Sequence, residues 1–584
     1  MKKNNSLAWN LKPISKFNRP EIERNVKAFA KKWKGTSEYL EKPEVLARAV
    51  GEYEQIQQTH GIGGNELYYS WLRTTQDEND PKIKGAFTQA MDFAHKMEDE
   101  MRFFELSLSK LDIKKQEFFL KNKNIFYFKH WLEKIFAQGK HTLSEPEEKI
   151  LSLKSQGAYL NWVQMVSGFL SKEGRKGRSF NELLSLIDST NKRERDSAAK
   201  AVNEIFAKHI ESAEHELNAV LMHKKIDDEL RGFARPDGSR HLSDDVDSTV
   251  VDAMLDAVES RFDIAQRFYK LKAKMLGVKK LKYHERNIPV ETKNEKRKTK
   301  NYGWQRSIAL VQQVMAGLDP EFADIFDRLI AGGQVDVFPR KGKHGGAFCA
   351  HELLSQPTYV LLNHTDKLRD VLTIAHEFGH AINNELMRNK LNALNFGTPT
   401  STAEVASTFM EDFVLQKLLR TADEKERLAI MMNRLNDDIS SIFRQVACYR
   451  FEQDLHREYR VKGYLSHKDI GALFQKNMRV YMGPAVEQSV GSENWWVYWS
   501  HIRNYFYVYS YAGGLLISKS LQASVKQDHA FIPKIKTFLA SGMSDSPKNI
   551  FAKMGVDISD KTFWQKGLDE VEILLQKTEK LAKK

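Results

Sequence analysis

Residues 376–380 read His-Glu-Phe-Gly-His, and these residue types at this spacing can bind a metal ion and activate water. His376 and His380 are four positions apart, so both imidazoles project from one face of an α-helix and reach the same ion. Glu377 points beside that ion. A zinc ion held by neutral imidazoles keeps a position for water and lowers its pKa, while a neighbouring carboxylate accepts the proton as water attacks a carbonyl. The motif therefore predicts a hydrolytic metal site.

The surrounding sequence predicts the helix that this chemistry needs. Apolar residues recur at helical spacing from Leu368 to Ile382, and either Thr365 or Asp366 is placed to cap the N-terminus. Gly379 interrupts this pattern between the two histidines. Glycine inside a helix costs about 1 kcal/mol relative to alanine, so its presence predicts that another segment packs closely at that point.

A third metal ligand is expected on a second amphipathic helix, which runs from Ser401 through Leu418. Glu404 is the candidate. The alternative is that Glu404 closes a capping box with Ser401, a common role for glutamate at this position. Glu411, two turns further along the same face, is placed to hold the outer N–H of a ligating histidine.

Composition indicates a large, mainly helical protein. The 584 residues are 41% hydrophobic, and only 14 prolines and 32 glycines interrupt long stretches rich in Lys, Glu, Leu and Ala. Cys349 and Cys448 are too few for a disulfide framework and fit a reducing compartment. Neither a signal peptide nor an apolar run of membrane-spanning length is evident, so we expect a cytoplasmic protein with no membrane partner.

The net charge of +13 raises the question of a nucleic-acid partner. The excess lysines are scattered among acidic residues, and the denser runs, 293–300 and 580–584, lie in expected loops or at the terminus. We therefore interpret the charge as a solvated basic surface and expect no nucleic-acid partner.

Helical patterns alternate with one short β-rich region. Helices are expected at 21–32, 43–60 and 81–108, followed by aromatic-rich helical segments, a basic break at 172–178, and further helices from 180 to about 277. Segments 281–285, 333–338 and 357–362 are typical of strands, with 345–349 as a turn or strand rim between the last two, and predict a small sheet before the metal helix. Its edge could bind an extended peptide or could simply complete the fold.

An aromatic segment at 495–514 supplies further candidates. His501 is followed by two pairs of tyrosines, each four residues apart: Tyr505 with Tyr509, and Tyr507 with Tyr511. If the segment is helical, each pair shares a face, so that one pair packs and the other presents its hydroxyl groups. A phenol or imidazole over the metal would stabilise the oxyanion formed when water attacks a peptide carbonyl.

Together these blocks resemble the thimet-type oligopeptidases, and most closely their oligoendopeptidase F branch. The similarity is carried by residues 376–380, by Thr-Ala-Glu-Val-Ala-Ser-Thr-Phe at 402–409, and by His501 with Phe-Tyr-Val-Tyr-Ser-Tyr-Ala at 506–512. Residues 346–348, 359–363, 443–445 and 451–452 match more weakly.

The resemblance implies a zinc metalloendopeptidase that cleaves short unstructured peptides. It implies one zinc ion per chain, with Glu377 as general base and then acid. It further implies a two-lobed, mainly helical fold with a deep central channel, and from it we expect an N-terminal helical lobe at 1–190 and a catalytic domain at 191–584. The expected metal ligands are His376, His380 and Glu404, and the expected stabilisers of the intermediate are His501 and one of Tyr507, Tyr509 and Tyr511.

Three alternatives are kept: a metallocarboxypeptidase of similar helical fold, a peptide-binding module with a degenerate site, and a nucleic-acid-binding protein. A carboxypeptidase requires a free C-terminal carboxylate on its substrate, and a binding module would not hydrolyse peptides at all. Salt-dependent nucleic-acid binding without peptidase activity would indicate the third.

Overall fold

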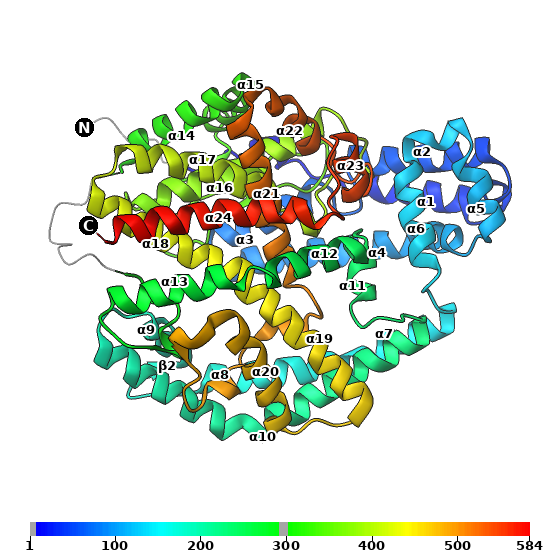
Figure 1. The fold of residues 1–584 in the computed structure, drawn as a ribbon. Helices are drawn as coiled ribbons and strands as arrows, with labels where there is room; N and C mark the ends of the chain where they lie inside the picture. Colours follow the sequence, from blue (N-terminus) through cyan, green and yellow to red (C-terminus); the bar gives the residue numbers. More distant parts are fainter. Residues whose placement is uncertain (1–6, 291–301, 584) are drawn as a thin grey trace. The chain divides into compact units, whose positions relative to one another are not determined.

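Long helices dominate the chain, as its composition predicts (Figure 1). The computed structural model describes residues 7–290 and 302–583. The described residues divide into two units, each built from three separate stretches of sequence. Unit 1 comprises Met1–Lys140, Lys298–Leu418 and Ser524–Gly555, and unit 2 comprises His141–Arg297, Leu419–Ala523 and Val556–Lys584.

Unit 1 contains the predicted metal helix, the N-terminal helices and a three-stranded sheet. Three N-terminal helices lie where the sequence predicts them. A further helix, α3, lies between the second and third of these, in a stretch where the glycines at 61, 63 and 64 indicated a break between helices. The helices are α1 (Arg19–Trp33), α2 (Pro43–Thr59), α3 (Gly64–Gln76), α4 (Pro81–Ser109), α5 (Ile113–Leu120), α6 (Lys129–Gly139), α14 (Trp304–Leu318), α15 (Pro320–Ala331), α16 (Leu368–Arg388), α17 (Val405–Thr421), α22 (Ile532–Leu539) and α23 (Pro547–Lys553).

Unit 2 is built around the 40-residue helix α10 (Lys192–Arg231), against which α8 and α9 pack. The other helices are α7 (Glu145–Ser155), α8 (Asn161–Lys172), α9 (Phe180–Ile187), α11 (Gly238–Ser243), α12 (Ser248–Glu259), α13 (Phe262–Met275), α18 (Glu424–Asp438), α19 (Arg444–Lys462), α20 (His467–Met482), α21 (Tyr509–Gln527, whose last turn crosses into unit 1) and α24 (Lys561–Leu581).

The predicted boundary between residues 190 and 191 coincides with no limit of these two units. It stays a prediction, as does the channel that the resemblance implies. A boundary at a single point in the sequence cannot describe units that are each assembled from three stretches.

The small sheet lies beside the metal helix, as predicted, and contains three strands in the order β4-β6-β5. β4 (Val335–Asp336) runs parallel to β6 (Tyr359–Leu361), and β5 (Phe348–Ala350) pairs antiparallel with β6. β5, expected as a turn or strand rim, is thus an edge strand of the sheet.

The strand expected at 281–285 does not join this sheet. Only Leu281–Lys282 is extended (β3), and it pairs with β7 (Val486–Glu487) in unit 2, while Tyr283–Glu285 turns into a 3₁₀-helix. The prediction was wrong in two respects. The strand pattern does not specify the partner with which extended backbone pairs, and residues 283–285 form a turn because the Glu285 carboxylate accepts a hydrogen bond from the Lys282 backbone N–H at 3.0 Å.

Hydrogen bonds join the sheet to segments that precede it in the sequence and to the metal helix that follows it. The Trp9 indole donates a hydrogen bond to the Val360 carbonyl at 2.8 Å, and the Tyr68 hydroxyl of α3 donates to the Ala350 carbonyl at 3.0 Å. At the other end, the Thr358 hydroxyl donates to Glu385 of α16 at 2.8 Å. The sheet and the metal helix are therefore held together.

α16 and α17 approach each other closely at Gly379. A Cβ atom added to residue 379 would lie 2.6 Å from the Ser407 Cα and 2.7 Å from the Ala406 carbonyl oxygen, closer than real Cβ contacts allow. The predicted close packing at this glycine is therefore present, and its partner is the first turns of α17.

Within the described ranges, no helix combines the length and the apolar character needed to span a bilayer.

Gly379→Ala should destabilise the protein by about 1–3 kcal/mol, because overpacking a tight contact forces the backbones apart. It should also lower metal affinity, since the same contact places the start of α17 against the histidines. Thermal unfolding and metal content measure the two effects.

Gly85→Ala is the matched control, because a Cβ there meets no atom within 4 Å and Gly85 lies on an exposed part of α4. It should leave stability unchanged or raise it by up to about 1 kcal/mol. Equal behaviour of the two variants would contradict the role given to the close contact.

Candidate active site

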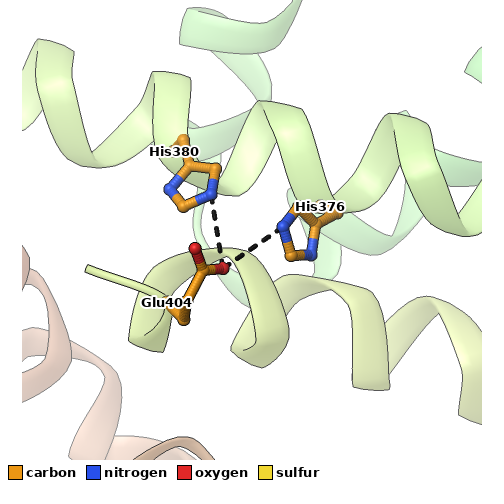
Figure 2. Close-up of side chains that lie close together, drawn as sticks. All are labelled: His376, His380 and Glu404. Carbon is orange, nitrogen blue, oxygen red and sulfur yellow. Dashed lines mark ion pairs between the residues drawn. The ribbon is translucent and has the colours of Figure 1, made fainter. Parts of the chain in front are cut away.

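Three side chains meet at one point in unit 1: His376 and His380 from α16, and Glu404 from the turn that precedes α17 (Figure 2). The helix expected to begin at Ser401 thus begins only at Val405. The Nε2 atoms of His376 and His380 lie 3.3 Å and 3.5 Å from the same carboxylate oxygen of Glu404. Tetrahedral zinc with bonds of about 2.0–2.2 Å separates its ligand atoms by roughly 3.3–3.6 Å. These two separations therefore fit the edges of a zinc tetrahedron.

The three donor side chains are also partly exposed to solvent. The side chains of His376, His380 and Glu404 keep 27%, 23% and 42% of their surface exposed. A closed structural zinc site has four protein ligands, whereas a catalytic site has three and an open position. The exposure of this three-donor set matches the catalytic kind.

The N-terminus of α16 is capped differently from the prediction. Lys367 is the N-cap residue, and Asp370 accepts hydrogen bonds from the backbone N–H of Lys367 at 3.0 Å and of Thr365 at 2.6 Å. The prediction of Thr365 or Asp366 as the cap was wrong, because a carboxylate three positions into the helix satisfies these donors instead.

The capping-box alternative for Glu404 is not formed. In the described part of the chain the buried Ser401 hydroxyl has no hydrogen-bond partner, and the Glu404 carboxylate faces the two histidines instead. The Ser407 hydroxyl donates to the same carboxylate oxygen at 2.9 Å. Ser407 was not among the predicted site residues, although a serine one turn after a candidate ligand on the same helix is a usable signal.

Glu411 lies where the sequence places it, on the far side of His376. Its carboxylate is 3.1 Å from the His376 Nδ1, which leaves Nε2 directed at Glu404. Such a contact fixes the ring orientation and makes the imidazole a stronger ligand.

The carboxylates also control protonation around the metal position. Burial alone would lower the pKa of His376, but its hydrogen bonds with Glu404 and Glu411 raise it to about 10. In the metal-free protein at neutral pH this imidazole therefore carries a proton, which a metal ion must displace. Burial opposes ionisation of Glu404, yet hydrogen bonds with His376 and His380 hold its pKa far below the usual value.

Glu377 lies in a different environment from Glu404. It is buried, and burial raises the pKa of its carboxyl group above the usual value, although the charges of His376 and His380 oppose the shift. A carboxyl group with a raised pKa exchanges protons at neutral pH more readily than an ordinary one, as a general base requires.

The edge strand β5 carries Cys349 beside the metal helix. The Asn384 side chain of α16 donates to the Cys349 sulfur at 3.5 Å, and burial raises the pKa of this thiol well above its usual value. The thiol is therefore neutral, and it is neither a thiolate ligand nor an activated nucleophile.

His501 and the tyrosines belong to unit 2. The His501 Nε2 lies 3.2 Å from the Tyr511 hydroxyl, and the Tyr507 ring stands 6.3 Å from the His501 ring and 5.5 Å from the Tyr511 ring. Burial lowers the pKa of His501, so its ring is neutral at pH 7. His501, Tyr507 and Tyr511 thus form one cluster.

Tyr509 points elsewhere. It is buried, and its hydroxyl donates to Asp244 at 2.9 Å. The Tyr505 hydroxyl likewise donates to the Val220 carbonyl at 3.1 Å. Of the three tyrosines that the sequence proposed, Tyr507 and Tyr511 are thus the ones grouped with His501.

The segment that carries these residues is not the continuous helix assumed from the sequence. A 3₁₀-helix covers Ser500–Arg503, and α21 begins only at Tyr509. Between them, Tyr505 and Phe506 have φ angles of 43° and 56°, which L-residues with large side chains rarely adopt. Such strain costs about 1–3 kcal/mol per residue and persists only where surrounding contacts impose it.

Those contacts come from two side chains, the buried Glu452 and the half-buried Arg240. Glu452 accepts a hydrogen bond from the Phe506 backbone N–H at 2.7 Å, and Arg240 donates to the carbonyls of Tyr505 and Asn504 at 3.0 and 2.8 Å. Burial raises the pKa of Glu452 to about 8. These two side chains hold the loop that joins His501 to Tyr507.

A second group of possible metal donors, Asp196, His284 and Glu285, lies in unit 2. Arg195 donates two hydrogen bonds to one oxygen of Glu285, at 2.8 and 3.0 Å, and Lys192 pairs with Asp196 at 2.9 Å. Because protein cations already neutralise these carboxylates, this cluster is an ion-pair network and not a metal site.

Comparison with known proteins places the chain in a family. The model for "Peptidase family M3" matches residues 186–570, which is more than half of the chain. The chain belongs to peptidase family M3. A second model, "Oligopeptidase F", matches residues 108–165 of this M3 peptidase.

Relatives share the sequence over most of its length. An oligoendopeptidase F homolog of Lactococcus lactis subsp. lactis is 23% identical over 89% of this chain and 88% of its own. Oligopeptidase PepF of Bacillus subtilis is 24% identical over 88% of this chain and 79% of its own. The family and these relatives identify the M3 peptidase as a metalloendopeptidase of the oligoendopeptidase F type, as the sequence motifs predict.

Solved structures share its fold. A crystal structure from Chlamydophila abortus, described as that of a peptidase, superimposes with a TM-score of 0.87 at 22% identity and covers 99% of this chain and 98% of its own. Oligoendopeptidase-F from Enterococcus faecium gives a TM-score of 0.70 at 19% identity and covers 96% and 98%. The mainly helical peptidase fold expected from the resemblance is confirmed.

Glu404→Ala should lose most of its bound metal, because two imidazoles alone make a weak site. Glu411→Gln should keep the metal but bind it about 10–100-fold more weakly, since it perturbs only the outer contact of His376. Elemental analysis after dialysis against graded chelator measures both. A fully loaded Glu404→Ala protein would show that the third ligand lies elsewhere.

Proposed function

We propose that this M3 peptidase is a zinc-dependent endopeptidase that hydrolyses short unstructured peptides with Glu377 as general base. The observation that carries the proposal is the meeting of His376, His380 and Glu404 at separations that fit tetrahedral zinc, with a buried glutamate adjacent on the same helix. Neutral imidazole and carboxylate donors in an open three-ligand set are the usual ligands of catalytic zinc.

When bound, zinc would polarise the attacking water and the substrate carbonyl. Glu377 then accepts the proton of the water and passes it to the leaving amine, a sequence that the raised pKa of its carboxyl group favours. Glu411 keeps the His376 ring oriented with Nε2 directed at Glu404, where these residues would hold the ion.

The edge strand β5 supports the proposal that the substrate is an extended peptide. β5 pairs with β6 on one side, and in the described part of the chain no strand pairs with its other side. An exposed edge offers backbone N–H and C=O groups to which a peptide can add as one more strand. A peptide must be unfolded locally to bind in this way, which favours short unstructured substrates.

His501 with Tyr507 or Tyr511 is proposed to stabilise the oxyanion of the tetrahedral intermediate. This role is assigned from the resemblance to oligoendopeptidase F. Within this cluster, the His501 Nε2 lies 3.2 Å from the Tyr511 hydroxyl, so the two polar groups can orient each other.

A cytoplasmic location belongs to the same proposal. Both cysteines are free thiols, Cys349 half-buried and Cys448 buried, as expected in a reducing compartment.

Glu377→Gln should lower kcat by about 10²–10⁴-fold, since the amide cannot accept the proton, while zinc content stays at the wild-type level. Turnover is measured by mass spectrometry on a peptide blocked at both termini, which a carboxypeptidase cannot cleave. Normal turnover in this variant would refute the assignment of the base, and chelator-resistant activity would refute the metal.

Substitution of the tyrosines distinguishes catalysis from packing. At least one of Tyr507→Phe and Tyr511→Phe should lower kcat by about 10²–10³-fold, the range measured for removal of one oxyanion donor. Tyr509→Phe should leave kcat near wild type but reduce the free energy of unfolding by about 1–3 kcal/mol, because it removes the hydroxyl donor of buried Asp244 and leaves this carboxylate only the longer 3.5 Å ion pair with Arg240. A large kcat loss confined to Tyr509→Phe would contradict the grouping of Tyr507 and Tyr511 with His501.

A further inference from the structure

Unit 2 contains a strongly basic hollow whose lining includes none of the residues assigned to the proposed reaction. It has a volume of about 540 Å³ and lies between the β1–β2 hairpin, α9 and the first turns of α10. Its lining carries one carboxylate, from Glu194. Five cations line it: Arg175, Lys176, Arg178, Arg193 and Lys200.

The hairpin places like charges against each other. β1 (Gly174–Arg175) pairs antiparallel with β2 (Arg178–Ser179), and Arg175 lies directly opposite Arg178. Like charges at directly opposed positions of a strand pair are destabilising. The Glu204 carboxylate pairs with Arg175. No ion pair within the described residues involves Arg178, although its charge acts on the Glu182 carboxylate from a longer distance.

The turn between the strands adds a second unfavourable feature. Lys176 and Gly177 have φ angles of 53° and 76°, as a two-residue type I′ turn requires at both positions. Glycine, asparagine and aspartate suit this conformation, whereas a lysine is strained in it. The turn thus places a third cation, Lys176, at the tip of the hairpin, between the two arginines in sequence.

The beginning of α10 is a third such feature. The helix starts at Lys192, so Arg193 lies in its first turn, where the positive end of the helix dipole disfavours cations. Among the ion pairs of the described residues, none involves Arg193 or Lys200, which both line the hollow. Opposed arginines, a left-handed lysine and a basic helix start thus gather positive charge and unfavourable backbone geometry in one small, solvent-exposed region.

A bound anion would relieve two of these costs, by neutralising the opposed arginines and by complementing the helix dipole. We propose that this basic hollow binds a compact, multiply charged phosphate compound. Its volume falls within the range of about 300–1,000 Å³ typical of small-molecule sites. A guanidinium group can donate two parallel hydrogen bonds to the oxygens of one phosphate.

Because no aromatic ring is among the described residues that line it, the site offers no surface for stacking a nucleobase. The ligand chemistry is therefore a cluster of phosphate groups and not a single-stranded nucleic acid.

Inorganic tripolyphosphate is the probe, titrated by calorimetry into the metal-loaded full-length protein. We expect one site per chain and a rise in the thermal unfolding temperature on binding. The triple variant R178Q/R193Q/K200Q should bind tripolyphosphate with an affinity at least about tenfold lower, because it removes three charged contacts. Its peptidase activity should be unchanged, which reports that it is folded.

The matched control is R24Q/K468Q/R479Q, which removes the same number of arginines and lysines from exposed positions outside the hollow. Tripolyphosphate also chelates divalent metals, but chelation affects both variants equally. Loss of affinity in the hollow variant alone supports the proposal, whereas no binding by the wild type, or equal loss in both variants, overturns it.

Further arms identify the source of the phosphates. The first test uses vesicles that carry a multiply phosphorylated inositol headgroup. If the protein binds tripolyphosphate but not these vesicles, the ligand is a soluble phosphate compound. If it binds the vesicles and the hollow variant does not, the ligand is the lipid headgroup. Binding of single-stranded RNA without binding of tripolyphosphate contradicts the proposal.

Discussion

The close approach of α16 and α17 at Gly379 is the constraint on which the metal centre depends. Any side chain at this position would collide with the Ser407 backbone, so glycine lets the two helices lie nearly in backbone contact. The contact lies between the two histidines on α16 and just after Glu404, which precedes α17. It therefore determines the distance between the imidazoles and the carboxylate. Ser407 both receives Gly379 and hydrogen-bonds Glu404, so packing and ligand orientation share one residue.

Within the site, environment and not residue type separates the roles of three glutamates. Glu404 lies between two imidazoles that hold its pKa far below the usual value, which suits a permanently ionised ligand. Glu377 is buried, and burial raises its pKa, which suits a group that takes up and releases a proton. Glu411 contacts the outer nitrogen of His376. Pairs of titratable groups whose pKa values are pushed apart mark the division between acid–base and binding functions.

The elements predicted from the sequence with success are those encoded locally. Helical periodicity and the spacing of His376 and His380 depend on residues within a few turns, and α16 follows the prediction apart from its cap. Glu404 could be proposed as the third ligand from its place at the start of the next predicted helix. What the sequence got wrong or left open required knowledge of distant partners. β3 pairs with a strand about 200 residues away, and the pair of tyrosines that packs, left open by the spacing, is Tyr505 with Tyr509, whose hydroxyl groups bond to Val220 and Asp244. No periodicity in the sequence contains such information.

Local rules fail most clearly where the backbone is left-handed without glycine. In the described residues this occurs at five positions, and four of them adjoin a proposed site: Lys176 in the basic hairpin, Asp366 before the metal helix, and Tyr505 and Phe506 between His501 and Tyr507. Folded proteins retain such conformations where other contacts impose them, and these places are commonly functional.

At Phe506 the imposing contact is Glu452, whose other oxygen is buried without a partner in the described part of the chain. A buried, half-satisfied carboxyl group is costly, as is a strained backbone. Neither would persist if holding this loop brought no advantage. The two costs occur together at the segment that joins His501 to Tyr507, which argues that the shape of this loop, and not only the identity of its tyrosines, determines how the His501 cluster is arranged.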